Sequence, residues 1–171
     1  EATPKHKLAN KGFLSLVVTQ FLGASNDYLL KQVLTFGLAA AGIWNSTLGD
    51  GGQSYVAAVL ALPFLLFSAV AGQLCDRHSK QLVAVRVKQA EFLIVMAAFA
   101  GFYFNNVYLC LLAMFLLGTQ SAFFGPAKYG VIPELVDTSK ISMANGIINM
   151  LTNVAVIAAT LVAGAIYEAY R

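Results

Sequence analysis

The stretch YVAAVLALPFLLFSAVAGQL, residues 55–74, decides the fold class of this chain. It runs for 20 residues without an Asp, Glu, Lys or Arg. An α-helix rises about 1.5 Å per residue, so a helix of this length crosses the roughly 30 Å hydrocarbon core of a bilayer. The stretch therefore predicts a transmembrane helix. Its proline, Pro63, removes one backbone hydrogen bond and predicts a kink.

Four further apolar stretches predict four more transmembrane helices, at residues 13–43, 82–104, 107–124 and 141–167. Hydrophobic residues make up 58% of the 171 residues and charged residues only 11%, against about 45–50% and about 25% in soluble domains. A soluble domain of this size could not bury so much apolar surface. We therefore predict an all-α membrane protein whose residues 1–171 form one transmembrane domain of five helices.

The short polar connectors predict the orientation of these helices. Lys and Arg occur in alternate connectors, as Lys5, Lys7 and Lys11, then Arg77 and Lys80, then Lys128 and Lys140. The connectors 45–54 and 105–106 contain none. Under the positive-inside rule this places the N-terminus in the cytoplasm. The net charge of +3 is not gathered into one basic stripe, which argues against a nucleic-acid partner.

The ends of the sequence suggest a piece of a longer protein. The first residue is Glu1, and an odd number of helices leaves the last one ending outside the membrane. We therefore expect further helices in the parent chain.

Ionisable residues within the predicted first helix mark a possible transport path. Asp27 and Lys31 are four residues apart, so they share one face and are close enough to pair. Gln20 falls on the same face, which should point into the bundle. Charges inside a membrane are costly and usually functional. Two interpretations stay open: an ion pair that only braces the helix, or a pair that acts in transport.

Other polar groups add to this candidate path. Arg86, Lys88 and Glu91 begin the third predicted helix. Lys88 and Glu91 are three residues apart and can pair, while Arg86 and Lys88 could instead extend to the lipid headgroups. Asn145, Asn149 and Asn153 form one stripe of the last helix, either as hydrogen bonds between helices or as the lining of a wet cavity.

Small residues predict helix packing. Gly118, Ala122 and Gly125 form a small face on the fourth predicted helix.

The sequence contains no motif typical of an enzyme active site. His6 and His78 have no carboxylate or cysteine partners at metal-ligand spacing, and no nucleophile motif or phosphate-binding glycine loop is present. Cys75 and Cys110 are predicted on opposite sides of the membrane, which argues against a disulfide. We expect no catalytic residue, no metal and no cofactor.

The connector after the second helix carries a recognisable motif. GQLCDRHSK, residues 72–80, resembles the loop motif G-x-L-A-D-R-x-G-R-K of the major facilitator superfamily, with departures at Cys75, Ser79 and Gln81. The resemblance assigns a gating role to four residues of this loop: Gly72, Asp76, Arg77 and Lys80. In that family the aspartate interacts with a helix N-terminus in the second half of the transporter, and a helix N-terminus favours a carboxylate.

Three further stretches narrow the resemblance: QFLGASND at 20–27 with Lys31, FGPAKYGVIPEL at 124–135, and ANG at 144–146. Together they resemble the bacterial lysophospholipid transporters, and the similar transporter domain fused to acyltransferase and acyl-ACP ligase domains. The resemblance implies the N-terminal six-helix bundle without its sixth helix. Its partners would be membrane lipid, the lysophospholipid substrate and the missing C-terminal half of the same transporter.

The resemblance also implies a function: facilitated flipping of lysophospholipids across the bacterial inner membrane by alternating access. Lys31 would then meet the substrate phosphate, oriented by Asp27. Alternatives are a proton-coupled exporter of small amphiphiles that uses Asp27, and the membrane domain of a bifunctional acyltransferase and acyl-ACP ligase. A purely structural anchor is disfavoured by Asp27 and Lys31, because an anchor has no use for buried charges.

The predicted topology can be tested by cysteine labelling of the full-length protein. A cysteine replacing Asp50, in the connector without Lys or Arg, should react with a membrane-impermeant thiol reagent added from the outside, since this connector is predicted to be extracytoplasmic. Modification from the cytoplasmic side only would contradict the topology.

Overall fold

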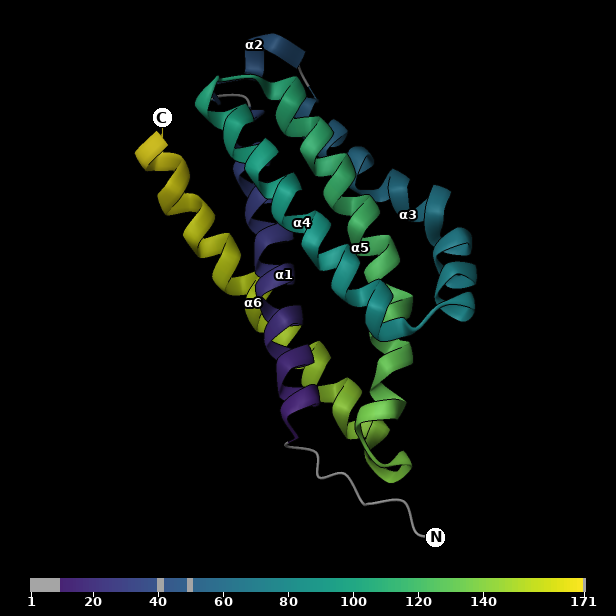
Figure 1. Ribbon diagram of the computed structural model, residues 1–171. Coiled ribbons are helices and arrows are strands. Elements are labelled where there is room, and N and C mark those ends of the chain that lie inside the picture. The colour runs from purple at the N-terminus through teal and green to yellow at the C-terminus, as the bar shows by residue number, and fades with distance from the viewer. Residues whose placement is uncertain (1–9, 40–41, 49–50, 171) are drawn as a thin grey trace, which may run out of the picture.

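The computed structural model describes residues 10–39, 42–48 and 51–170, which form helices and no β-strand. The long helices are α1 (Lys11–Gly37), α3 (Gly52–Arg77), α4 (Lys80–Tyr103), α5 (Val107–Leu135) and α6 (Ile141–Tyr170), as Figure 1 shows. A short helix, α2 (Asn45–Leu48), precedes α3, and a 3-10 turn, η1 (Thr138–Lys140), precedes α6. The predicted all-α fold class is confirmed.

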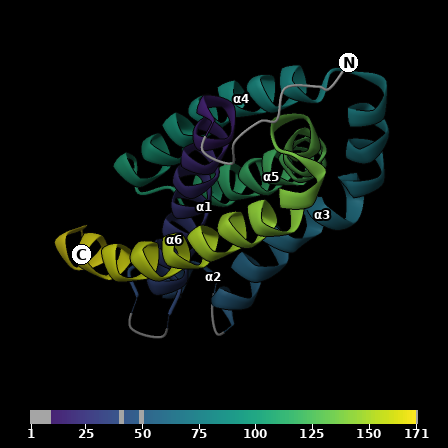
Figure 2. The ribbon, with the colours of Figure 1, turned by 90° about the horizontal axis from the view of Figure 1, so that it is seen from below.

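The helices alternate in direction along an elongated bundle. α1, α4 and α6 begin at one end of the bundle, and α3 and α5 run back towards it (Figure 1). α5 packs against α3, α4 and α1, and α1 packs against α6. The view along the bundle places α5 among these neighbours (Figure 2). α1 and α5 are therefore the helices where a buried site can form.

The first helix ends earlier than predicted, at Gly37 and not at residue 43. Trp44 folds back over Gly37, where its backbone N–H donates to the Gly37 carbonyl at 2.8 Å. A Cβ at Gly37 would lie 2.6 Å from the indole ring, so glycine is needed for this contact. The indole Nε1 donates to Asn105 Oδ1 at 2.6 Å and thereby joins two connectors at this end of the bundle.

The fourth long helix continues further than predicted, to Leu135 and not to residue 124. Pro126 and Pro133 lie inside it. Membrane helices tolerate proline where neighbouring structure surrounds the disturbed backbone, and Ala127 and Lys128 are buried here. Lys128 is therefore part of α5 and not of a connector, which corrects its predicted place.

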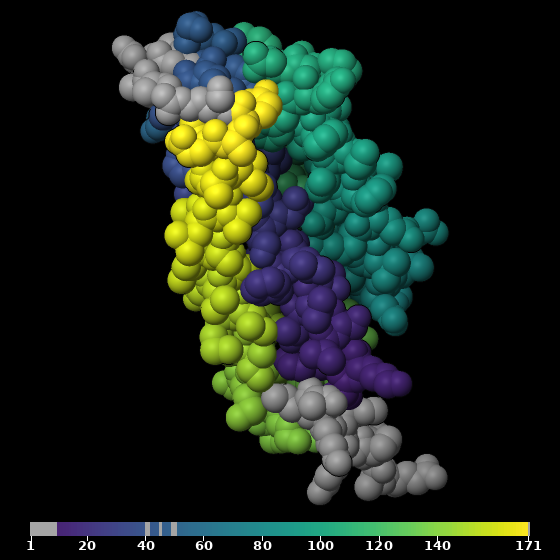
Figure 3. Space-filling view, turned by 90° about the vertical axis from the view of Figure 1, so that its left-hand side faces the viewer, coloured from purple at the N-terminus to yellow at the C-terminus, as the bar shows by residue number. Residues whose placement is uncertain are grey.

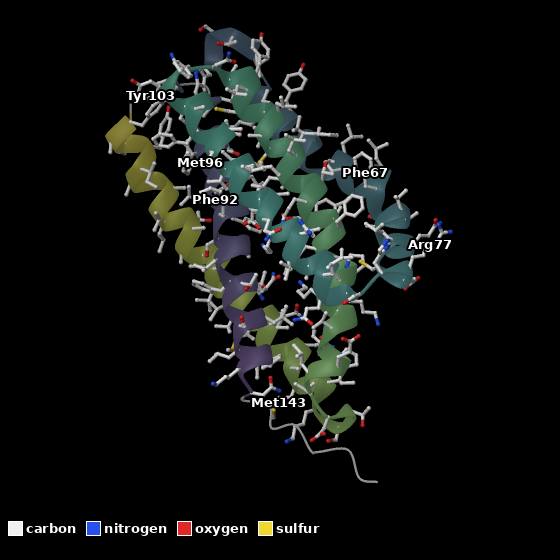
Figure 4. The ribbon with its side chains drawn as sticks, in the orientation of Figure 1. Phe67, Arg77, Phe92, Met96, Tyr103 and Met143 are labelled. Carbon is white, nitrogen blue, oxygen red and sulfur yellow. The ribbon has the colours of Figure 1, made fainter. Side chains whose placement is uncertain are left out.

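The bundle presents many large apolar side chains outwards and buries two polar ones. Exposed side chains include Leu65 (82%), Leu161 (72%) and Phe92 (68%), whereas Gln120 and Lys128 are buried. Phe92, Met96 and Tyr103, all exposed on α4, are labelled in Figure 4. An apolar exterior of this kind suits lipid as the solvent.

Among the described residues, three helices are long and apolar enough to cross a membrane, by length and composition: Gly52–Arg77, Val107–Leu135 and Thr138–Tyr170. α1 and α4 have similar lengths but contain several charged residues. The prediction that all five long helices are spans stays a prediction.

The interface between α3 and α5 depends on one small residue. A Cβ at Gly118 would lie 2.9 Å from the Leu60 carbonyl oxygen and 3.1 Å from Pro63 Cγ, whereas one at Gly125 would meet nothing within 4 Å. The predicted packing role of Gly118 is confirmed, whereas no described residue packs against Gly125.

This difference predicts the effect of two matched substitutions on α5. Gly118→Ala should destabilise the full-length protein by about 1–3 kcal/mol, because a backbone oxygen must move. Gly125→Ala should leave stability unchanged or slightly increased. Thermal unfolding in detergent would measure both, and equal effects of the two changes would contradict the packing assignment.

Candidate functional site

The candidate site is a network of polar side chains where α1, α4 and α5 meet. On α1, Asp27 accepts a hydrogen bond from Ser121 of α5, with 2.6 Å between Ser121 Oγ and Asp27 Oδ2. The other carboxylate oxygen, Oδ1, is buried without a hydrogen-bond partner. Asp27 is therefore tied to α5 and not to its neighbour on α1.

The predicted ion pair between Asp27 and Lys31 is absent among the described residues, so the pairing prediction is wrong, and the transport role of either residue stays a prediction. Lys31 Nζ lies over the Tyr28 ring, 5.5 Å from its centroid. Helical spacing allowed the pair, but Ser121 provides the Asp27 carboxylate with a closer partner from another helix.

The predicted pair of Lys88 and Glu91 is formed on α4. Gln120 of α5 donates to the same Glu91 oxygen, with 2.9 Å between Nε2 and Oε2. Ser121 Oγ also lies 3.1 Å from Gln120 Oε1. Close polar contacts thus run from Asp27 to Glu91 and Lys88 through two adjacent residues of α5, although the single Ser121 proton can be donated to only one of its two acceptors at a time.

Gly23 makes room for this network on α1. A Cβ at this position would lie 2.2 Å from Lys88 Nζ and 3.6 Å from Glu91 Oε1. Lys88 Nζ also lies 4.4 Å from the centroid of the Phe124 ring, within cation–π range. The absence of a side chain at residue 23 lets an ammonium group pack against the backbone of α1.

Gln20 connects α1 to α6 instead. Its Nε2 donates to Thr152 Oγ1 at 3.0 Å. The Thr152 hydroxyl donates in turn to the Ile148 carbonyl of its own helix. The polar face of α1 thus reaches three other helices.

Lys128 is a second intramembrane cation without a carboxylate partner among the described residues. It is only 9% exposed. Its Nζ lies 4.6 Å from the centroid of the Tyr129 ring. A buried ammonium group that makes no ion pair is unusual and points to an anionic ligand.

Several predicted path residues lie outside the network. Arg86, Asn149 and Asn153 are exposed. Asn145 is half-buried, and its Oδ1 is buried without a hydrogen-bond partner. Their role in a transport path stays a prediction, as does that of the residues within the network.

The predicted gating motif lies at the end of α3 and the start of α4. Asp76 and Arg77 are exposed; Figure 4 labels Arg77. Lys80 pairs with Glu134 at the end of α5, with 3.6 Å between Nζ and Oε1. The motif is thus joined to α5 through Lys80 and leaves Asp76 accessible.

Two cavities adjoin Lys88, one of about 510 Å³ between α1, α4 and α5 and one of about 360 Å³ between α1 and α4. Lys88 and Thr19 line both. The smaller cavity also reaches Gly23, Asn26 and Glu91. In the space-filling view, α1 is visible between α4 and α6 (Figure 3).

The sequence interpretation missed Gln120, Ser121 and Thr152, and it placed Lys128 in a connector. Thr119, Gln120 and Ser121 form a run of three polar side chains within the apolar stretch 107–124. Lys128 follows Ser121 by seven residues, which is two helical turns. These two signals could have identified the polar face of α5.

Comparison with known proteins gives a consistent picture. A family model described as "Transmembrane secretion effector" matches residues 33–170. The lysophospholipid transporter LplT of Photorhabdus laumondii is 27% identical over 157 residues, 92% of this chain and 37% of the relative. The LplT of Salmonella newport is 29% identical over 164 residues, 93% of this chain. The chain thus spans 37% of the length of these relatives. No solved structure matches.

The Lys88–Glu91 pair predicts a non-additive mutational effect. Lys88→Gln and Glu91→Gln should each destabilise the full-length protein, because each leaves one unpaired charge in the bundle. The double variant should recover part of the loss, with a coupling energy of about 1–3 kcal/mol. Thermal unfolding of the four proteins measures this, and simple additivity would contradict the pairing.

Proposed function

The chain belongs to the transmembrane secretion effector family of the major facilitator superfamily, and from this we propose that it forms part of a lysophospholipid transporter. The relatives named above are lysophospholipid transporters. Like them, this multi-pass membrane chain would flip its substrate across the bacterial inner membrane, with its N-terminus in the cytoplasm. It would do so by alternating access, together with the rest of the parent protein.

The observation that carries the proposal concerns two cations within the long helices, Lys31 and Lys128, which have no carboxylate partner in the part of the chain that the structure describes. A lysophospholipid has an anionic phosphate that must cross an apolar region, and ammonium groups bind phosphate as point charges. Lys88, by contrast, is paired with Glu91. Lys31 and Lys128 therefore have the charge and the freedom that a passing phosphate needs.

The position of these cations along the helices supports a path. Asp27 and Ser121 mark one level, because they are hydrogen-bonded. Lys31 lies four residues further along α1, about 6 Å towards the Trp44 end. Lys128 lies seven residues further along α5, about 10 Å in the opposite direction. A phosphate could thus exchange between cations at two depths of the membrane.

The faces of the two helices agree with this path. Residues four or seven apart share a helix face, so Lys31 lies on the Asp27 face and Lys128 on the Ser121 face. Gly125, between Ser121 and Lys128, has open space where a Cβ would be. The single acyl chain needs only apolar surroundings, which the exposed Leu and Phe side chains of the bundle provide.

Flipping of labelled lysophosphatidylethanolamine in proteoliposomes tests the proposal with the full-length protein. Lys31→Gln and Lys128→Gln should each slow flipping by about tenfold or more, because each removes a charge-assisted contact to phosphate. Lys11→Gln, which removes an exposed cation at the start of α1, is the matched control and should flip normally.

A double variant separates binding from helix bracing. Asp27→Asn with Lys31→Gln should stay as slow as Lys31→Gln alone, since the phosphate contact is lost in both. Near-normal flipping in the double variant, or in both single lysine variants, would contradict the role of these cations.

A further inference from the structure

The charged side chains of α4 differ in whether they have a partner. Lys80 pairs with Glu134 of α5, and Lys88 pairs with Glu91 of α4 itself. Arg86 is exposed and makes no ion pair with any described residue. Its guanidinium is therefore the one charge of α4 without a counter-ion in the part of the chain that the structure describes.

The surface around Arg86 is apolar. Residues four before it and seven after it share its helix face, and these are Leu82, 53% exposed, and Leu93, 70% exposed. The single acid of α4, Glu91, instead accepts a hydrogen bond from Gln120 of α5. The outer face of α4 thus combines one unpaired cation with large exposed apolar side chains, which is the complement of an amphiphile with an anionic head.

Arg86 lies near one end of this outer face. It follows the first residue of α4, Lys80, by about 9 Å along the helix axis. Side chains on an α-helix lean towards its N-terminus, and the long arginine side chain extends in that direction to the level of the lipid headgroups. Tyr103, which is 76% exposed, lies about 26 Å beyond Arg86. The cation and the phenol ring are thus spaced like the two interfaces of a hydrocarbon core of roughly 30 Å.

The exposed side chains between these two ends provide an apolar surface for acyl chains. Phe92 is 68% exposed, Met96 52% and Phe99 66%. Figure 4 labels Phe92 and Met96 along α4, with Tyr103 at its far end. A phospholipid whose phosphate contacts Arg86 can therefore lay its acyl chains over these side chains, towards the centre of the bilayer.

We propose that Arg86 and the outer face of α4 bind an anionic phospholipid of the surrounding bilayer as a resident ligand. The planar guanidinium donates two parallel hydrogen bonds to the phosphate oxygens, a geometry that an ammonium group does not match. An anionic headgroup is favoured over a zwitterionic one, because it adds no second cation beside Arg86. Arg86, which the sequence pattern placed on the transport path, then contacts the surrounding lipid instead.

A fluorescent reporter on α4 of the full-length protein in lipid vesicles tests this site. A bimane group on a cysteine that replaces Met96 is quenched by lipids with brominated acyl chains when they contact the helix. The other accessible cysteines of the full-length protein are replaced first, whereas Cys75 and Cys110 are buried. Brominated phosphatidylglycerol should bind at this position about fivefold more tightly than brominated phosphatidylcholine, which is the preference that one arginine near an anionic lipid provides.

Variants of the cation assign this preference to Arg86. Arg86→Gln should abolish it, and Arg86→Lys should keep part of it, because the charge remains while the two parallel hydrogen bonds are lost. Lys11→Gln removes an exposed cation at the start of α1 and is the matched control, which should keep the full preference. Brominated phosphatidylethanolamine, whose phosphate is accompanied by an ammonium group, should bind like phosphatidylcholine.

Three results would overturn the proposal. The first is equal binding of phosphatidylglycerol and phosphatidylcholine by the protein with Arg86 intact. The second is an unchanged preference in Arg86→Gln, or an equal loss in Lys11→Gln, which would assign the preference to general surface charge. The third is equal binding of phosphatidylglycerol and phosphatidylethanolamine, which would refute the choice of an anionic lipid. None of these measurements requires transport, so their outcome is independent of the proposed function.

Discussion

Polar groups in an apolar solvent must satisfy one another, and this constraint governs the arrangement of α1, α4 and α5. Water cannot hydrogen-bond a charge in the middle of a bilayer, so a charge there is stabilised by polar partners within the bundle. Asp27, Glu91 and Lys88 do so at one level of the bundle, through Ser121 and Gln120. Those contacts fix the rotation of three helices about their axes, because turning any one would expose a charge to lipid.

Apolar contacts and close helix packing stabilise the parts of the bundle that lie outside the polar network. At one end of the bundle, Trp44 packs over Gly37 and against Phe102, whose ring centroid lies 5.6 Å from that of the indole. Along the length, Gly118 lets α5 approach the backbone of α3. Lipid competes well for apolar side chains, so close approach and hydrogen bonding, more than hydrophobicity, hold membrane helices together.

Hydropathy was enough to predict the helical class and the approximate stretches, because the bilayer sets helix length. Hydropathy did not predict the ends of two helices. α1 ends at Gly37, where Trp44 folds back onto the helix, and α5 continues through Pro126 to Leu135. Hydropathy also did not identify the hydrogen-bond partner of Asp27. Helical spacing relates residues on one helix, as for Lys88 and Glu91, but says nothing of contacts between helices. Asp27 and Ser121 are 94 residues apart, and only the packing of α1 on α5 brings them together.

The two acids of the network receive different sets of donors. Glu91 receives an ammonium group and an amide N–H, both of which stabilise its charge. Asp27 receives one hydroxyl and has a bare oxygen. The two carboxylates thus have different surroundings, one with two donors and one with a single donor. Ser121 has one hydroxyl proton, so it can donate to either Asp27 Oδ2 or Gln120 Oε1 and not to both at once.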